Sequence, residues 1–213
     1  RTRWSGVRIP PGAPLNQGIT EYVVRVTDLV NLDAYPIQDI ESPVAQALVT
    51  RCRQDLDKSA LCTLEQFVSP DALMAMKSEI DGMLNTAYRA EHKRTPYSWR
   101  YNLDFPDDHP RRALHLNRYG YLLNHQFKEA TLISQLYEWT PLTEFVRHVL
   151  GFETLYQTAD PYLSIVINIM QTGDELAWHF DTNDGVVSLM LQTADEGGQF
   201  EYAPYIRDEV DEN

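Results

Sequence analysis

The sequence predicts an α+β domain in which helices come first and antiparallel strands follow. Apolar residues recur at helical spacing through much of the first two thirds of the chain, whereas the last third holds short apolar runs separated by turn residues. Consecutive strands joined by short turns pair antiparallel, and the preceding helices then cover one face of their sheet. The length of 213 residues suits one domain with a substantial core.

The first 17 residues differ in kind from the rest, because they are basic, rich in proline and glycine and without periodicity. We expect residues 1–17 to be disordered, or to be an artefact of an upstream reading frame, and residues 18–213 to form a single domain. Residues 22–27 are rich in β-branched side chains and predict a short strand. Ser42-Pro43 predicts the start of a helix that runs to about residue 56, since serine caps a helix and proline suits its first turn.

The middle of the chain predicts two further helical regions. Residues 61–67 are strand-like, and the pair Ser69-Pro70 then opens an amphipathic helix. Its apolar positions fall at helical spacing, at Leu73, Met76, Ile80 and Leu84. Residues 89–109 are polar and predict an irregular segment, with a loop at 104–110. A second helical pattern covers residues 130–150, is interrupted near Thr140-Pro141 and stops at Gly151, a residue type that favours helix ends.

The last third predicts four strands, at residues 162–170, 176–181, 186–193 and 199–202. In the first of them the side chains alternate between two faces. One face is uniformly aliphatic and is expected to pack against helices, with Leu163, Ile165, Ile167 and Ile169. The other face mixes polar and apolar groups, as a face lining a pocket does, with Tyr162, Ser164, Val166, Asn168 and Met170.

Composition excludes several classes of function. The formal net charge of −13 disfavours nucleic acid and anionic membranes as partners, because both are bound through lysine and arginine. No apolar run approaches the roughly 20 residues that cross a bilayer, and no secretory signal is evident, so we expect a cytoplasmic protein. The two cysteines, Cys52 and Cys62, are too few for a disulfide framework and are expected to be reduced.

The sequence His179-Phe180-Asp181 carries the clearest chemical signal. A histidine and an aspartate two residues apart on a strand point to the same side, because side chains alternate with period 2. One imidazole nitrogen and one carboxylate oxygen then supply two of the three ligands of a facial triad, the arrangement that holds ferrous iron and leaves positions open for chemistry. We therefore predict that His179 and Asp181 are metal ligands.

The surroundings of this pair resemble a known family. The runs His-Phe-Asp-Thr-Asn-Asp-Gly-Val-Val-Ser-Leu-Met-Leu-Gln (179–192) and Gly-Gly-Gln-Phe-Glu-Tyr (197–202) resemble the iron- and 2-oxoglutarate-dependent oxygenases. The closer similarity is to the small-molecule branch that includes amino-acid hydroxylases and free-amino-acid halogenases, and it covers residues 162–202. The resemblance implies a double-stranded β-helix (a cupin-like jelly roll) with N-terminal helices packed on one sheet.

The resemblance also implies an activity and its cofactors. These are Fe(II), the cosubstrate 2-oxoglutarate and O2, with no catalytic side chain beyond the metal ligands. A halogenase needs a vacant position for chloride, which Asp181 fills, so the implied reaction is hydroxylation of an aliphatic carbon in a small molecule, with a free amino acid as the best guess. The distal histidine and the Arg or Lys that binds 2-oxoglutarate are expected beyond Asn213. The barrel is then incomplete in this chain, which is expected to be inactive without them.

Other residues and other functions stay open at this point. Asn168 is a candidate contact for the cosubstrate, and Thr182 and Asn183 either orient Asp181 or simply form the turn. Arg100, Arg111 and Arg112 either bind a substrate carboxylate or lie at the surface. The alternatives for the whole protein are oxygenation of a peptide side chain, a cupin-like metal- or ligand-binding module without redox chemistry, and an inactive fragment.

Overall fold

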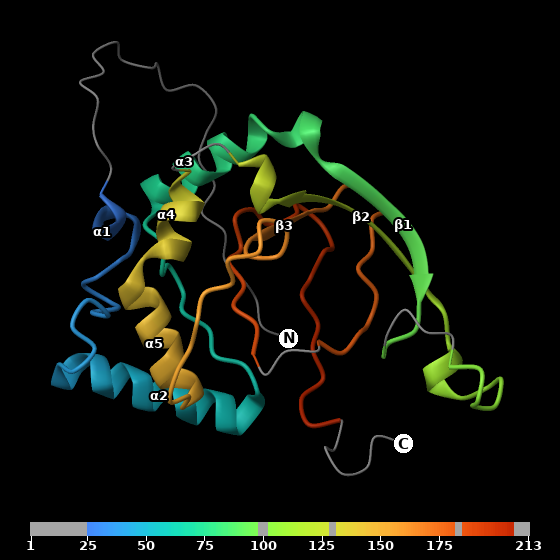
Figure 1. The fold of residues 1–213 in the computed structure, drawn as a ribbon, viewed down its shortest axis with the longest axis horizontal. Helices are drawn as coiled ribbons and strands as arrows, with labels where there is room; N and C mark the ends of the chain where they lie inside the picture. Colours follow the sequence, from blue (N-terminus) through green and yellow to red (C-terminus); the bar gives the residue numbers. More distant parts are fainter. Residues whose placement is uncertain (1–24, 98–101, 128–130, 182–184, 207–213) are drawn as a thin grey trace.

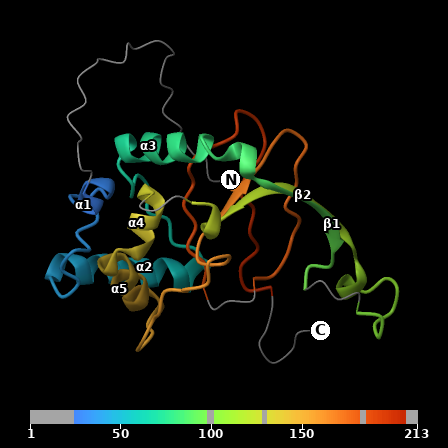
Figure 2. The same ribbon diagram turned by 45° about the horizontal axis from the view of Figure 1, so that its top comes forward.

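The computed structural model describes residues 25–97, 102–127, 131–181 and 185–206, so the predicted leader lies outside it. These residues form five α-helices and a three-stranded antiparallel sheet, which confirms the predicted α+β class. Figures 1 and 2 show the helices gathered on one side of the molecule and strands β1 and β2 curving away from them. The chain after β3 lies inside this curve. No helix in the described ranges is long and apolar enough to cross a membrane.

The helices begin and end at residues whose chemistry suits helix ends. Their bounds are α1 Val26–Leu29, α2 Pro43–Ser59, α3 Pro70–Asp81, α4 Leu132–Glu138 and α5 Thr140–Leu150. The Ser42 and Ser69 hydroxyls cap α2 and α3 by accepting hydrogen bonds from Ala45 N and Ala72 N, each at 3.3 Å. Gly151 ends α5 with φ 74°, a conformation in which glycine has no side chain to clash. The helix predictions from 42, 69 and 130 are confirmed, except that α3 ends at Asp81 and leaves the predicted helical position Leu84 in a 3-10 turn, 43% exposed.

The core lies among the helices, in two adjoining clusters of buried side chains. The first joins α1, α3 and α4 and contains Leu29, Val30, Val68, Ala72, Met76, Leu132 and Leu136. The second joins α2 and α5 and contains Tyr35, Ile37, Leu48, Val49, Cys52 and Phe145. Both cysteines are free, as predicted, and burial raises the pKa of the Cys62 thiol to about 12.

The sheet has the order β1-β2-β3, with β1 Tyr88–Arg94, β2 His115–Leu123 and β3 Val166–Ile169. Both pairings are antiparallel, with His92 opposite Asn117 in one and Tyr121 opposite Asn168 in the other. Short 3-10 turns flank the strands at η1 Leu84–Thr86, η2 Pro110–Arg112 and η3 Asn124–Gln126. The sheet is thus built from segments far apart in the sequence.

The prediction of an irregular segment at 89–109 was wrong for its first part. Residues 88–94 form β1, although the run Tyr-Arg-Ala-Glu-His-Lys-Arg has no apolar alternation. Its alternation lies in burial instead: Ala90, His92 and Arg94 are half-buried, while Glu91 and Lys93 are exposed. Pairing with β2 along its whole length makes this polar segment a strand. The predicted loop at 104–110 is confirmed.

Several predicted strands are absent from the described residues. Residues 26–29 are helix α1 rather than the end of a strand, and the 61–67 region contributes only an isolated bridge between Val30 and Val68. Within 162–170 the strand is confined to β3, where Ile167 and Ile169 are half-buried as predicted but Leu163, before the strand, is 69% exposed. The segments 176–181, 186–193 and 199–202 are not strands, because no neighbouring chain pairs with them.

Candidate metal centre

The chain reaches the candidate ligands through a five-residue excursion from the sheet edge. Gly120 of β2 faces Ile169 of β3, and Arg118 faces Glu175 through two backbone hydrogen bonds of 2.8 and 2.9 Å. From the first pair to the second there are two residue steps along β2, from 120 to 118, and six along the facing chain, from 169 to 175. Residues 170–174 therefore loop out and return the chain to the same edge of β2.

Asp174 fixes this excursion. Its side chain is only 3% exposed and accepts two hydrogen bonds from the Arg89 guanidinium at 2.8 and 2.7 Å, one to each oxygen. It also accepts one from the Gln171 backbone N–H at 2.8 Å, and Arg118 Nε lies 3.6 Å away. The hydrogen bonds from Arg89 lower the pKa of Asp174 to about 2, so the carboxylate is ionised at neutral pH.

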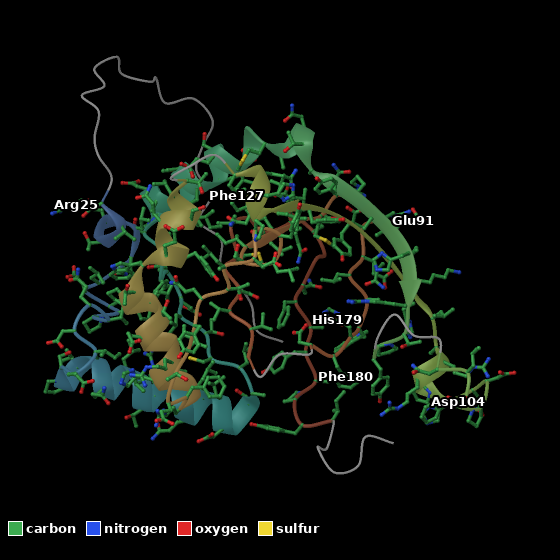
Figure 3. The ribbon with its side chains drawn as sticks, viewed as in Figure 1. Arg25, Glu91, Asp104, Phe127, His179 and Phe180 are labelled. Atoms are coloured by element: carbon green, nitrogen blue, oxygen red, sulfur yellow. The ribbon has the colours of Figure 1, made fainter. Side chains whose placement is uncertain are left out.

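After Glu175 the chain crosses β2. The Ala177 N–H donates to Asn117 Oδ1 at 3.1 Å, so the chain passes over β2 on the face to which Asn117 points. The Phe180 N–H then donates to Pro96 O at 2.9 Å, beyond the end of β1. Figure 3 shows His179 and Phe180 inside the curve of the sheet. His179 is thus held between two hydrogen-bonded neighbours, Ala177 and Phe180.

The His179 ring is oriented by its own backbone. Nδ1 lies 2.7 Å from Ala177 O, and because a carbonyl oxygen only accepts, Nδ1 carries the hydrogen. In the neutral ring Nε2 then keeps its lone pair, which is the form that binds a metal. Nε2 lies 3.4 Å from Asp181 Oδ1, so the predicted convergence of the two side chains is confirmed. The same distance also permits an ion pair if the ring is protonated.

This spacing suits two ligands of one metal ion. Donor atoms about 2.1 Å from a metal, and about 90 to 109° apart around it, lie roughly 3.0 to 3.4 Å from each other. The His179 and Asp181 side chains are 27% and 58% exposed, so an ion can reach both. Within the described ranges no group of three His, Cys, Asp or Glu side chains is arranged to hold a metal. A metal ion at this pair would thus have two protein ligands among the described residues.

The other predicted site residues lie elsewhere. Asn168 is exposed on β3 and pairs with Tyr121 of β2. Tyr121 is four residues from Asn117, the β2 residue that contacts the chain before His179, so at 3.3 Å per residue these two positions of β2 are roughly 13 Å apart. Thr182 and Asn183, together with Arg100, fall outside the described residues. Arg112 forms an ion pair with Asp107 at 2.5 Å within its own loop.

An aromatic and cationic stack adjoins the ligand pair. The ring of Phe180, which separates the two ligands in sequence, lies 4.9 Å from the ring of Tyr97. The Arg111 guanidinium lies 4.4 Å over the same Tyr97 ring and 5.2 Å from that of Phe105. Arg111 therefore contacts Tyr97, which in turn contacts Phe180 between the two candidate ligands. Trp178, the residue before His179, takes no part in this stack and is 52% exposed.

Three residues around the pair escaped the sequence prediction, namely Asn117, Ala177 and Tyr97. Asn117 sits in the run His-Leu-Asn-Arg-Tyr-Gly-Tyr-Leu-Leu, where nothing distinguishes a buried asparagine from an exposed one. Its complete burial, at 0% exposure, is the signal that marks it, and only the fold reveals that.

Comparisons with protein-family models, with curated proteins and with solved structures gave no match. The case for a metal centre therefore rests on the geometry of His179 and Asp181 and on the sequence around them.

Proposed function

We propose that the protein is a non-haem iron, 2-oxoglutarate-dependent dioxygenase that hydroxylates an aliphatic carbon of a small molecule, with a free amino acid as the favoured substrate class. One observation carries the proposal: His179 Nε2 and Asp181 Oδ1 lie 3.4 Å apart, with the other ring nitrogen donating to a backbone carbonyl. A histidine and a carboxylate on adjacent coordination positions are two thirds of the facial triad that such enzymes use.

The proposal extends to the fold. A jelly roll places its metal ligands on the inner face of a curved sheet. The curve of β1 and β2, with His179 inside it, supports this part of the proposal (Figure 3). The described sheet has three strands and is open, so the jelly roll is an inference from this curvature and from the sequence resemblance.

The residues of this chain would divide the work as follows. His179 and Asp181 hold the iron, which together with 2-oxoglutarate and O2 supplies the oxidation when bound. The Ala177 carbonyl keeps the hydrogen on Nδ1 and so directs the Nε2 lone pair toward the metal. Asp181 occupies the position that a halide would need, which favours hydroxylation over halogenation. Phe180 packs its ring 4.9 Å from that of Tyr97, a contact that holds the backbone between the two ligands.

The decisive experiment uses a longer protein that contains this chain together with the distal histidine and the Arg or Lys that the resemblance implies, with Fe(II) and 2-oxoglutarate under anaerobic conditions. We expect a visible absorption band from the iron–2-oxoglutarate complex, and after addition of oxygen and a panel of amino acids we expect succinate and a hydroxylated product. His179→Ala and Asp181→Ala should each remove both the band and the product. His125→Ala is the matched control, because this exposed histidine contacts Tyr88 and Tyr162 at the opposite end of β2 and should leave both signals intact.

The outcomes separate the candidate functions. An iron complex without succinate formation for any substrate would favour the cupin-like binding module. A folded protein that binds no iron at His179 and Asp181 would contradict the metal centre itself. Chlorinated product from the unmodified chain would contradict the role given to Asp181.

A further inference from the structure

We propose that Asn117 is a positioning residue that sets the orientation and tautomer of His179 without touching the metal. This inference rests on the proposed metal-binding role of His179, but it concerns a residue of β2, 60 positions before its hydrogen-bond partner Ala177. Three features carry it: the burial of Asn117, its two hydrogen bonds, and the bond that Ala177 in turn accepts from His179.

Asn117 is an unusual residue for its place. It lies opposite His92 within the pairing of β1 with β2 and is 0% exposed. A buried amide is unfavourable unless it is hydrogen-bonded, and an aliphatic residue would fill such a strand position without that cost. The Asn117 side chain meets the requirement by accepting from Ala177 N at 3.1 Å and donating to His115 O at 3.2 Å.

The first of these bonds determines where Ala177 lies. At this point the chain has left the edge of β2, so a side chain of β2 takes the place of a backbone partner. Ala177 is itself 5% exposed, and its carbonyl accepts the Nδ1 hydrogen of His179 at 2.7 Å. Asn117 thus fixes Ala177, and Ala177 fixes the His179 ring. Removing the Asn117 oxygen should release the His179 ring while leaving both proposed ligands present.

The test measures the His179 tautomer in the metal-free protein by histidine nitrogen–proton correlation NMR. We expect Nδ1–H to dominate in the unmodified chain. Asn117→Leu, which retains bulk without an acceptor, should lower the ratio of Nδ1–H to Nε2–H by roughly 2- to 10-fold, the equivalent of one hydrogen bond. Asn117→Asp keeps the oxygen that accepts from Ala177 N but loses the bond to His115 O, so it should restore the ratio in part and exceed Asn117→Leu. Loss of packing alone would not produce this rescue.

A second measurement is Co²⁺ affinity, followed by visible absorption. Changes in residues that orient metal ligands cost roughly 10- to 100-fold in affinity, and we expect that loss for Asn117→Leu and not for Asn117→Asp. If Asn117→Leu does not fold, hydrogen exchange in the unmodified chain decides: the Ala177 amide should exchange as slowly as the paired amides of β2. Exchange at the rate of an unprotected amide would overturn the proposal.

The two proposals fail in different ways. A folded Asn117→Leu protein with the original tautomer ratio and the original Co²⁺ affinity would overturn the role of Asn117 and leave the proposed metal centre standing. A shifted tautomer in a protein that binds no Co²⁺ in any form would support the role of Asn117 in orienting the ring and contradict the proposed function.

Discussion

At the scale of single residues, Asp174 makes a clear prediction about acid stability. Hydrogen bonds from Arg89 lower its pKa from 3.8 to about 2, so the folded protein favours the ionised form. As the pH falls below about 4, the unfolded chain takes up this proton before the folded one does, and the stabilisation is lost progressively toward pH 2. Asp174→Asn should therefore be less stable at neutral pH and should lose less stability between pH 4 and pH 2, measured as the urea midpoint.

Asp107 provides the control for this prediction. It also pairs with an arginine, Arg112, but its side chain is 91% exposed, where ion pairs contribute little. Asp107→Asn should follow the unmodified protein at every pH. If Asp174→Asn lost stability in acid as steeply as the unmodified protein, another group would be the source of the dependence.

Residues also differ in how far the sequence alone predicts them. Alternation on a strand at 176–181 predicted that His179 and Asp181 point to one side. Their side chains do lie 3.4 Å apart, but the segment is not a strand, so this proximity does not follow from the alternation that predicted it. Asn117 could not be predicted in this way. Its burial depends on where the chain crosses β2 some 60 residues later, and no local pattern contains that information.

At the scale of elements, the two serine caps predict measurable and unequal contributions. Ser42→Ala and Ser69→Ala should each reduce the free energy of unfolding by about 1 kcal/mol, because each hydroxyl accepts from an N–H of the first helical turn. Both hydroxyls also donate to a carbonyl, Ser42 to Asp39 O at 2.7 Å and Ser69 to Asp28 O at 3.2 Å. Ser69→Ala should cost more, because its second bond joins α3 to α1, whereas that of Ser42 stays within the turn before α2. Urea denaturation of the two variants measures the difference.

Thr50 is the matched control for the caps. It is an exposed hydroxyl residue inside α2, where its Oγ1 donates to Gln46 O. Thr50→Ala should be neutral or slightly stabilising, because alanine favours the helix interior. A loss as large as that of the cap variants would mean that the capping bonds are not what the serines contribute.

The elements also show why helices were predictable and strands were not. The signals at 42, 69 and 151 are local, since a cap and the first or last turn are adjacent in sequence. Strand β1 instead depends on β2 as its partner, and its polar sequence conceals that. The apolar run 186–193 has the composition of a strand but no partner in the described chain, so it forms none.

At the scale of the whole molecule, apolar surface is concentrated in the segment 185–206. Its exposed apolar side chains are Val186, Val187, Leu189, Met190, Phe200, Tyr202, Tyr205 and Ile206. Extended chain with unpaired backbone and exposed apolar groups tends to associate. The combined change Val187→Glu and Phe200→Glu should reduce light scattering on concentration without lowering the melting temperature. Gln199→Glu adds charge beside the same surface without removing apolar area, and an equal effect from it would contradict this explanation.

For the molecule as a whole, the sequence predicted the fold class but not how the strands pair. The α+β class followed from the order of helical and strand-like patterns, and the helical core followed from periodicity. The closure of strands into a barrel is a property of many distant pairings, and the three described strands form an open sheet. His179 and Asp181 lie side by side without those pairings, and their role as metal ligands stays a prediction.

The excursion at residues 170–174 has a consequence for insertions and deletions in this chain. It adds four residues to one side of the pairing with β2, and the Arg118–Glu175 bridge anchors the chain again directly after it. Residues inserted or lost among positions 171–173 would therefore change the size of the loop and leave the register of Glu175, and with it the place of His179 and Asp181, unchanged. The limit on length variation is the contact of Asp174 with Gln171 and Arg89, which the shortened or lengthened loop must still allow.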